Sequence, residues 1–176
     1  LNIDNIEKDN KYYQNHISKV TLFFRYCSPN LKDEIFDEFE IVLDEFYENI
    51  GFFTRKNNLK IFKNLTNREA EEYPILSDLL EYIKTIYDVE EDEFRKERLD
   101  KIKLKLQKLI SSNGILINGH SSINIQNEDL VVFNIKELST LSQEIFSAVI
   151  FNILSILWEE MIKNVDIENL GDRVDN

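Results

Sequence analysis

Long stretches of this chain contain neither glycine nor proline, and this scarcity constrains its fold more than any other feature of the sequence. The 176 residues include only four glycines and two prolines. Because tight turns rely on these residues, an all-β sandwich with its many turns is a poor fit. Apolar residues recur at helical spacing through most of the uninterrupted stretches. The sequence therefore predicts a mainly α-helical protein.

About five helices are expected over residues 1–114, which we predict to be a helical subdomain. Ser28 and Pro29 are suited to start the second helix and Gly51 to stop it, while Ser77 is suited to start a later one. Residues 51–66 have no firm period and fit a short helix or loop. The stretch KIKLKLQK alternates like a strand, but its wider segment follows helical spacing. The expected helices are 9–27, 29–49, a short one after the capping-box spacing at 66–69, 78–87 and 93–112.

The apolar pattern changes after residue 114, where we predict a small hairpin, a strand and a long helix over 115–164. Asn118-Gly119 is a turn signal between the short apolar run 115–117 and the alternating run 122–126. Leu130 to Ile135 is apolar nearly throughout, which is typical of a strand covered on both faces. The helix that follows is apolar over most of its circumference and ends near residue 164. Residues 165–176 are expected to be a polar tail.

Charge is distributed unevenly along the chain. The net charge of −12 opposes nonspecific binding of nucleic acid or of acidic membranes. Residues 28–50 hold eight acidic residues and one basic residue, whereas 94–110 hold seven basic and two acidic residues. We interpret these segments as two helix faces that attract each other. A nucleic-acid surface over Arg95 to Lys108 is the weaker alternative.

Known arrangements of catalytic and ligand-binding residues are absent from the sequence. Cys27 is the only cysteine, and the two histidines, His16 and His120, lack the spacing of a zinc site. Five acidic residues fall within 88–93, and we interpret them as favourable charges at a helix N-terminus rather than as metal ligands. None of the glycines precedes the Lys-Ser or Lys-Thr pair of a phosphate-binding loop. We therefore predict no catalytic, cofactor-binding or metal-binding residue in this chain.

Residues 118–138, NGHSSINIQNEDLVVFNIKEL, resemble a segment of the TraC/TraE-type conjugation ATPases of type IV secretion systems, which belong to the HerA/FtsK-like P-loop superfamily. The shared pattern is N-G-x-[ST], a turn, and then V-V-F-x-[LI]-x-x-L. Upstream, Pro74, Leu76, Ser77, Asp78 and Leu79 resemble that family's P-x-L-S-D-L entry into a helix. Asn134 departs from the pattern, because the family usually has aspartate there.

The resemblance implies that this chain lies between the phosphate loop and the acidic nucleotide motif of a longer parent. The chain begins at Leu1 and its only methionine is Met161, which favours an excised piece. The fold would then be a helical subdomain plus part of a RecA-like α/β ATPase domain. ATP and Mg²⁺ are implied for the parent, and no cofactor for this piece. The implied location is cytoplasmic, at the inner face of the membrane through partners.

The expected partners are other secretion-system components and the rest of the parent ATPase. An excised strand and helix should expose apolar surface, which favours self-association. No transmembrane segment is expected, and nucleic acid is not an expected partner. The alternative function is a stand-alone acidic helical interaction module without catalysis, which binds a basic partner through residues 28–50. The residues expected to carry self-association are Leu130, Val132, Ile150, Leu154 and Trp158.

Overall fold

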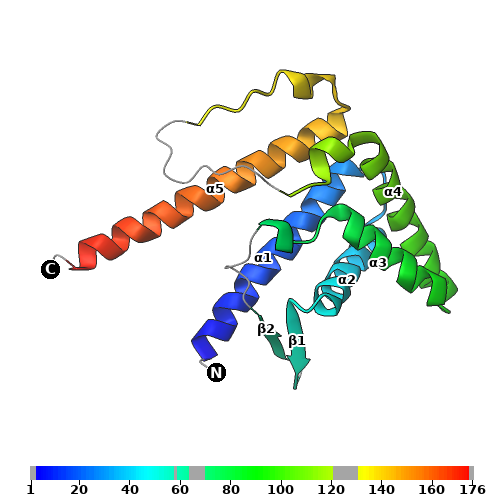
Figure 1. Cartoon of the computed structure of the whole chain (residues 1–176), viewed down its shortest axis with the longest axis horizontal. Coiled ribbons are helices and arrows are strands. Elements are labelled where there is room, and N and C mark those ends of the chain that lie inside the picture. The colour runs from blue at the N-terminus through cyan, green and yellow to red at the C-terminus, as the bar shows by residue number, and fades with distance from the viewer. Residues whose placement is uncertain (1–2, 58, 64–69, 121–130, 175–176) are drawn as a thin grey trace. The chain divides into compact units, whose positions relative to one another are not determined.

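The computed structural model describes residues 3–57, 59–63, 70–120 and 131–174, which form two compact units divided after residue 122. The described residues are mainly helical, with five α-helices and one small antiparallel sheet, which confirms the predicted fold class at that level. Because the positions of the two units relative to each other are not determined, each unit is described by itself (Figure 1).

The first unit begins with two helices that pack against each other, α1 (Ile3–Cys27) and α2 (Asp33–Asn49). The prediction that Ser28 and Pro29 start α2 is wrong, because α2 begins at Asp33 and its N-cap is Lys32. The Ser28 N–H instead donates to the Arg25 carbonyl, so this part of the chain still belongs to the end of α1. The chain reverses direction between these two packed helices over residues 28–32.

The end of α2 leads into a β-hairpin, β1 (Phe53–Lys56) paired with β2 (Leu59–Phe62). Gly51 adopts a left-handed conformation with φ of +78°, which confirms its predicted role as the helix stop. The hairpin replaces the short helix or loop expected over 51–66. Phe53 pairs with Phe62 across the strands and is fully buried, so packing of aromatic side chains decides a segment with no firm sequence period.

Two further helices complete the first unit, α3 (Leu76–Val89) and α4 (Glu93–Ile117), after a short 3-10 helix η1 (Ala70–Glu72). The capping-box spacing at 66–69 lies outside the described residues. The strand-like KIKLKLQK is helical as predicted, and its helical spacing buries Ile102 and Leu106 while Leu104 is exposed. The predicted end of α4 near residue 112 is marked by a non-helical Asn113, but the helix resumes to Ile117. Residues 115–117 are therefore helical and not the predicted first arm of a hairpin.

The core of the first unit lies where α2, α3 and α4 meet, with α1 and the hairpin covering α2 (Figure 1). Side chains from every one of these elements are buried there. Two phenylalanines, Phe24 of α1 and Phe39 of α2, stack with ring centroids 4.2 Å apart. The other fully buried apolar residues include Phe36, Val42, Phe53, Ile83, Leu99, Ile102 and Leu106.

The second unit contains an extended segment, a short 3-10 helix η2 (Glu137–Thr140) and the long helix α5 (Gln143–Val174). The described part of the predicted strand, 131–135, has no regular secondary structure, because the described chain supplies no neighbouring strand for a hydrogen-bonded ladder. The alternating run 122–126 and Leu130 lie outside the described residues. The predicted end of the long helix near residue 164 is wrong, because α5 continues to Val174.

Among the helices that the structure describes, none combines the length and the apolar character that crossing a membrane would require.

Candidate functional site: an aromatic pocket

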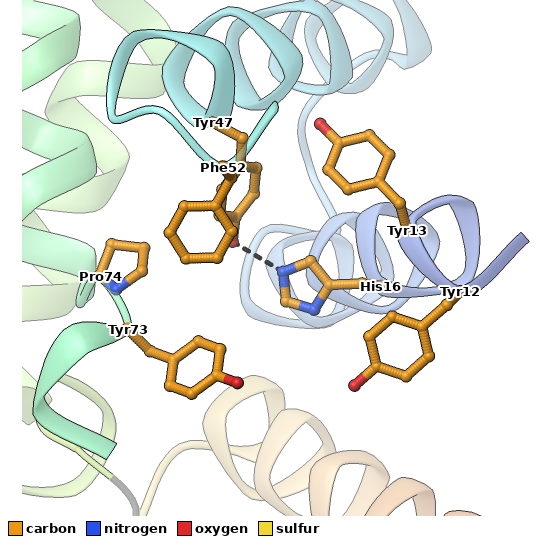
Figure 2. A pocket seen from close by; sticks show the side chains of 7 residues that line it. All are labelled: Tyr12, Tyr13, His16, Tyr47, Phe52, Tyr73 and Pro74. Carbon is orange, nitrogen blue, oxygen red and sulfur yellow. Dashed lines mark hydrogen bonds between the residues drawn. The ribbon is translucent and has the colours of Figure 1, made fainter. Parts of the chain in front are cut away.

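Seven residues of the first unit line a pocket with a volume of about 100 Å³ (Figure 2). They come from three places in the sequence: α1, the end of α2 with the residue after Gly51, and the segment before α3. Apart from the imidazole of one histidine, the lining consists of aromatic rings and one proline. The residues are Tyr12, Tyr13, His16, Tyr47, Phe52, Tyr73 and Pro74.

Neighbouring rings around this pocket contact one another, and the plane of each ring is tilted relative to the plane of the one before it. Tyr13 meets Tyr47 at an interplanar angle of 84°, Tyr47 meets Phe52 at 58°, and Phe52 meets Tyr73 at 56°. Because successive planes are tilted so strongly, the rings curve around the space and do not stack into a flat layer. Edge-to-face and tilted contacts of this kind are the favourable ones for aromatic rings.

His16 and Tyr47 form the polar part of the pocket. The His16 Nε2 and the Tyr47 hydroxyl lie 2.7 Å apart in a hydrogen bond (Figure 2). Although His16 as a residue keeps exposed surface, desolvation of its ring lowers the pKa of the imidazole, and the charge of Lys19 adds to this effect. Burial also raises the pKa of the Tyr47 hydroxyl. Both shifts favour neutral forms, so the pocket is an uncharged aromatic site at neutral pH.

Asp44 holds the Tyr13 ring, one wall of the pocket, in position. Its carboxylate accepts a hydrogen bond of 2.8 Å from the Tyr13 hydroxyl and pairs with Arg55 and Lys60 of the hairpin. Burial raises the pKa of the Tyr13 hydroxyl, and the Asp44 hydrogen bond and charge reinforce the shift. One carboxylate thus ties α1, α2 and both strands together, which holds the Tyr13 ring in place. The Lys60 ammonium also lies 4.5 Å from the centroid of that ring.

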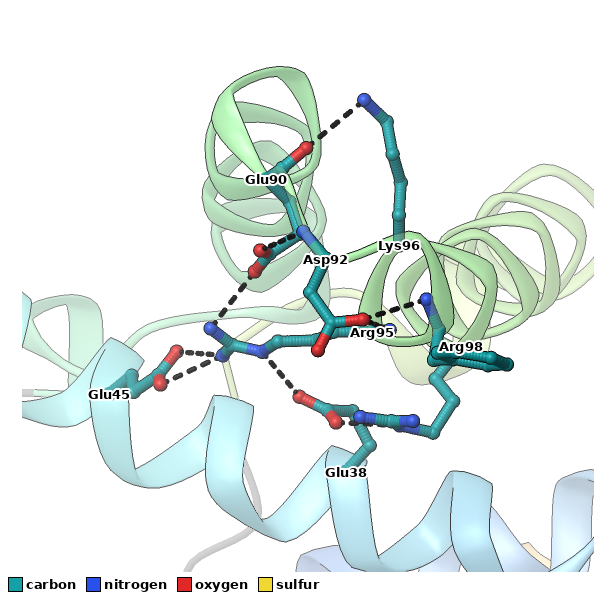
Figure 3. A network of polar contacts seen from close by, with 8 residues as sticks. Glu38, Glu45, Glu90, Asp92, Arg95, Lys96 and Arg98 are labelled. Atoms are coloured by element: carbon teal, nitrogen blue, oxygen red, sulfur yellow. Dashed lines mark hydrogen bonds and ion pairs between the residues drawn. The ribbon is translucent and has the colours of Figure 1, made fainter.

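A second polar cluster joins α2 to α4 (Figure 3). The Glu38 carboxylate is only 3% exposed and accepts from Arg95 Nε at 2.9 Å and Arg98 Nε at 2.8 Å. Arg95 also binds both carboxylate oxygens of Glu45 and one oxygen of Glu90. Burial alone would lower the pKa of the Arg95 guanidinium, but the hydrogen bonds to Glu38 and Glu45 raise it above its ordinary value.

This cluster confirms that the acidic segment 28–50 and the basic segment 94–110 attract each other. It also gives roles to two members of the acidic run 88–93. The Asp92 side chain caps α4 by accepting from the Phe94 and Arg95 backbone N–H groups, and Glu90 pairs with Arg95. Within the described residues, no group of His, Cys, Asp and Glu is arranged to hold a metal ion.

Two residues singled out by the sequence patterns meet across the fold. The Asn118 side chain accepts a hydrogen bond of 2.8 Å from the Ser77 backbone N–H and donates one of 2.7 Å to the Ser77 hydroxyl. Ser77 was expected to cap α3, but the N-cap is Ile75. Ser77 lies in the first turn of α3, where N–H groups lack a partner within the helix. Asn118 supplies that partner from a position 41 residues away.

The remaining chemical candidates of the sequence do not join the pocket. Burial raises the pKa of the Cys27 thiol to about 11, so this cysteine is protonated at neutral pH and is not activated as a nucleophile. His120 is exposed, and its neighbours Ser121 and Ser122 lie outside the described residues.

Sequence reasoning placed His16 on a helix without a role and did not find the pocket around it. The Tyr12-Tyr13 and Tyr73-Pro74 pairs are the only local signals, and neither indicates a pocket by itself. The other walls are single aromatic residues of α2 and the segment that follows it.

Comparison with known proteins identifies one relative and no family. An uncharacterized plasmid protein of Bacillus anthracis is 30% identical over 151 residues, which are 85% of this chain and 23% of that protein. The chain thus spans about a quarter of the length of the relative it matches. No family model matches the chain. No solved structure matches it.

Proposed function

We propose that this chain is a segment of a conjugative-transfer ATPase of a type IV secretion system. Its first unit would be the helical subdomain, and its second unit would supply a strand and a helix to a RecA-like nucleotide-binding core. The nucleotide-binding residues would lie outside this chain. The parent would act in the cytoplasm at the inner face of the membrane, where it would power channel assembly or substrate transfer together with other secretion components.

The observation that carries this proposal is the contact between Ser77 and Asn118. Each residue belongs to one of the two sequence patterns that resemble the conjugation ATPases. The two patterns stand far apart in the sequence. Hydrogen bonds from the Asn118 side chain to both the backbone N–H and the hydroxyl of Ser77 are expected if both patterns are parts of one structural unit.

Two further observations support the proposal. The segment 131–135 is apolar, and Val132 is 79% exposed and without a strand partner in the described chain, as expected of a strand whose sheet is completed by other residues. The Bacillus anthracis relative is a plasmid protein that extends well beyond the region matched here. Conjugative transfer is a plasmid function, and its motor needs more residues than this chain contains.

The alternative of a stand-alone acidic interaction module loses part of its basis in the fold. It assigned the binding of a basic partner to the acids of α2. Glu38 and Glu45 already pair with arginines of α4, and Asp44 and Glu48 pair with the hairpin. Paired carboxylates attract an external basic segment less strongly, because their charge is largely offset by their neighbours.

Calorimetric titration with Mg-ATP tests the proposal on two proteins. The 176-residue chain should not bind ATP, and the full-length product of the gene that encodes it should bind and hydrolyse ATP. The open reading frame should also encode a phosphate-binding loop ahead of Leu1 and an apolar strand ending in acidic residues beyond Asn176. A full-length product without ATPase activity, or tight magnesium-dependent ATP binding by the chain itself, would overturn the assignment.

A further inference from the structure

The size of the aromatic pocket restricts what can occupy it. Its volume of about 100 Å³ is well below the roughly 300–1,000 Å³ of typical cofactor and small-molecule sites. The space therefore suits the head group of one side chain and excludes a nucleotide. Tyr12 and Tyr73, both exposed, stand at its rim, so the occupant can enter from solvent (Figure 2).

The chemistry of the lining favours a flat cation. Aromatic faces carry partial negative charge, and a guanidinium group stacks on them more readily than an ammonium group, because it is planar and more weakly hydrated. Besides Tyr13, whose ring already lies near the Lys60 ammonium, the pocket offers four such rings, and none of its residues carries a positive charge when His16 is neutral. The exposed carboxylates Glu71 and Glu72 directly precede Tyr73, and the chain as a whole carries a net charge of −12.

Polar atoms in the pocket match the donors of a guanidinium group. With His16 neutral and its Nε2 accepting from the Tyr47 O–H, the Tyr47 oxygen keeps the capacity to accept another hydrogen bond. The Tyr12 side chain is exposed, and its hydroxyl can accept a hydrogen bond as well.

We propose that this pocket binds an arginine side chain presented by a partner protein. The guanidinium group enters between Tyr12 and Tyr73, stacks on the aromatic wall and donates to the hydroxyls of Tyr12 and Tyr47. Asp44, through Tyr13, and His16, through Tyr47, hold the rings in position before binding, so little side-chain freedom is lost when the arginine enters. This inference does not depend on the ATPase assignment.

The test is an NMR titration of the full 176-residue chain that follows its two histidine rings. The probe is the tripeptide acetyl-Gly-Arg-Gly-amide, and the matched control replaces arginine by citrulline, which has nearly the same shape but no charge. We expect the arginine peptide to shift the His16 ring signals while those of His120, which does not line the pocket, stay unchanged. Citrulline and lysine peptides should shift His16 weakly.

Substitutions at the rim locate the binding. Tyr73→Leu and Tyr12→Leu should each lower the affinity for the arginine peptide roughly three- to tenfold, which is the range expected for losing one cation–π contact. Tyr73→Phe keeps the ring and should retain most of the affinity. Tyr26→Leu removes an exposed tyrosine of the same helix outside the pocket and should change nothing. Because these side chains are exposed, the fold should survive each change.

Several results would overturn the proposal. An unshifted His16 ring in the presence of the arginine peptide would exclude binding at this pocket. Equal shifts from the citrulline peptide would show that charge is not recognised, and equal shifts from the lysine peptide would show that the flat guanidinium is not selected. A Tyr26→Leu effect as large as that of Tyr73→Leu would place the binding elsewhere.

Discussion

The first unit has an extensive apolar core, whereas Ile145 and Ala148 are the only buried apolar residues in the described part of the second unit. In the first unit, Leu106 of α4 is 0% exposed, and the helices on either side of it supply the cover. In the second unit, α5 buries Ile145 and Ala148 near its beginning, but Leu154 is 59% and Trp158 is 62% exposed. A single helix that is apolar around most of its circumference cannot cover itself. The contrast indicates a self-sufficient unit beside one that needs more protein.

The largest expected effect compares the two kinds of leucine. Leu106→Ala should lower the free energy of unfolding by about 3 kcal/mol, because it removes a fully buried side chain and leaves a cavity. Leu154→Ala should change it by no more than about 0.5 kcal/mol, since that side chain is mostly solvated already. Urea unfolding followed by circular dichroism measures both. Equal losses would mean that α5 is covered in solution, and the contrast between the units would fail.

A smaller effect tests whether the charged cluster around Glu38 contributes to the stability of the first unit. Glu38→Gln should destabilise the chain by about 2 kcal/mol, less than for a fully buried pair, because Arg95 and Arg98 are partly exposed. Glu40→Gln makes the same change two residues away on the exposed side of α2 and should cost no more than about 0.5 kcal/mol. If the two variants unfold at the same urea concentration, the cluster does not stabilise the fold.

Self-association through the second unit stays a prediction that sedimentation can test. Trp158→Glu should weaken any association of the chain with itself roughly tenfold or more, because a charge would replace an exposed aromatic anchor. Val89→Glu, at an equally exposed apolar position at the end of α3, is the control and should leave association unchanged. A strictly monomeric wild-type chain at high concentration would contradict the prediction.

The smallest expected effect is the dependence of stability on pH through His16. Burial lowers the pKa of its imidazole in the folded chain below the ordinary 6.5, so the unfolded chain binds more protons near that pH. Stability from this group is therefore full above about pH 6.5 and is lost as the pH falls toward the folded-state pKa. His16→Gln should flatten this part of the stability profile measured by urea unfolding from pH 7 to pH 5. An unchanged slope would contradict the assignment.

Local sequence patterns predicted the helices well and their junctions poorly. The apolar spacing of α2 and α4 identified both helices, including the strand-like KIKLKLQK, because helical periodicity extends over several turns. Ser28 and Ser77 are good capping residues and Pro29 suits a first helical position, yet none of them starts a helix here. The start of a helix also depends on how the chain must turn to pack, and Asn118 replaced the expected cap of α3 from far along the sequence.

The hairpin and the pocket depended on contacts that no local pattern reports. Residues 53–62 carry no clear strand period, and their pairing is stabilised by aromatic contacts among Tyr13, Phe53 and Phe62. The pocket likewise gathers aromatic residues from three separate segments. The charge pattern was more informative, because the opposite net charges of two amphipathic helices predicted their contact. The ion pair between Glu38 and Arg95 forms part of that contact.

The sequence by itself determined that the chain is helical, that its acidic and basic segments would pair, and that it carries no recognisable nucleotide-binding loop. These conclusions follow from periodicity, net charge and the absence of glycine motifs, which are properties of the chain before it folds. Only the tertiary structure decided where the helices begin, that residues 53–62 form a hairpin, and that His16 stands among tyrosines. Each of these depends on which distant side chains reach the same place, because burial and hydrogen bonding are set by neighbours in space and not by neighbours in sequence.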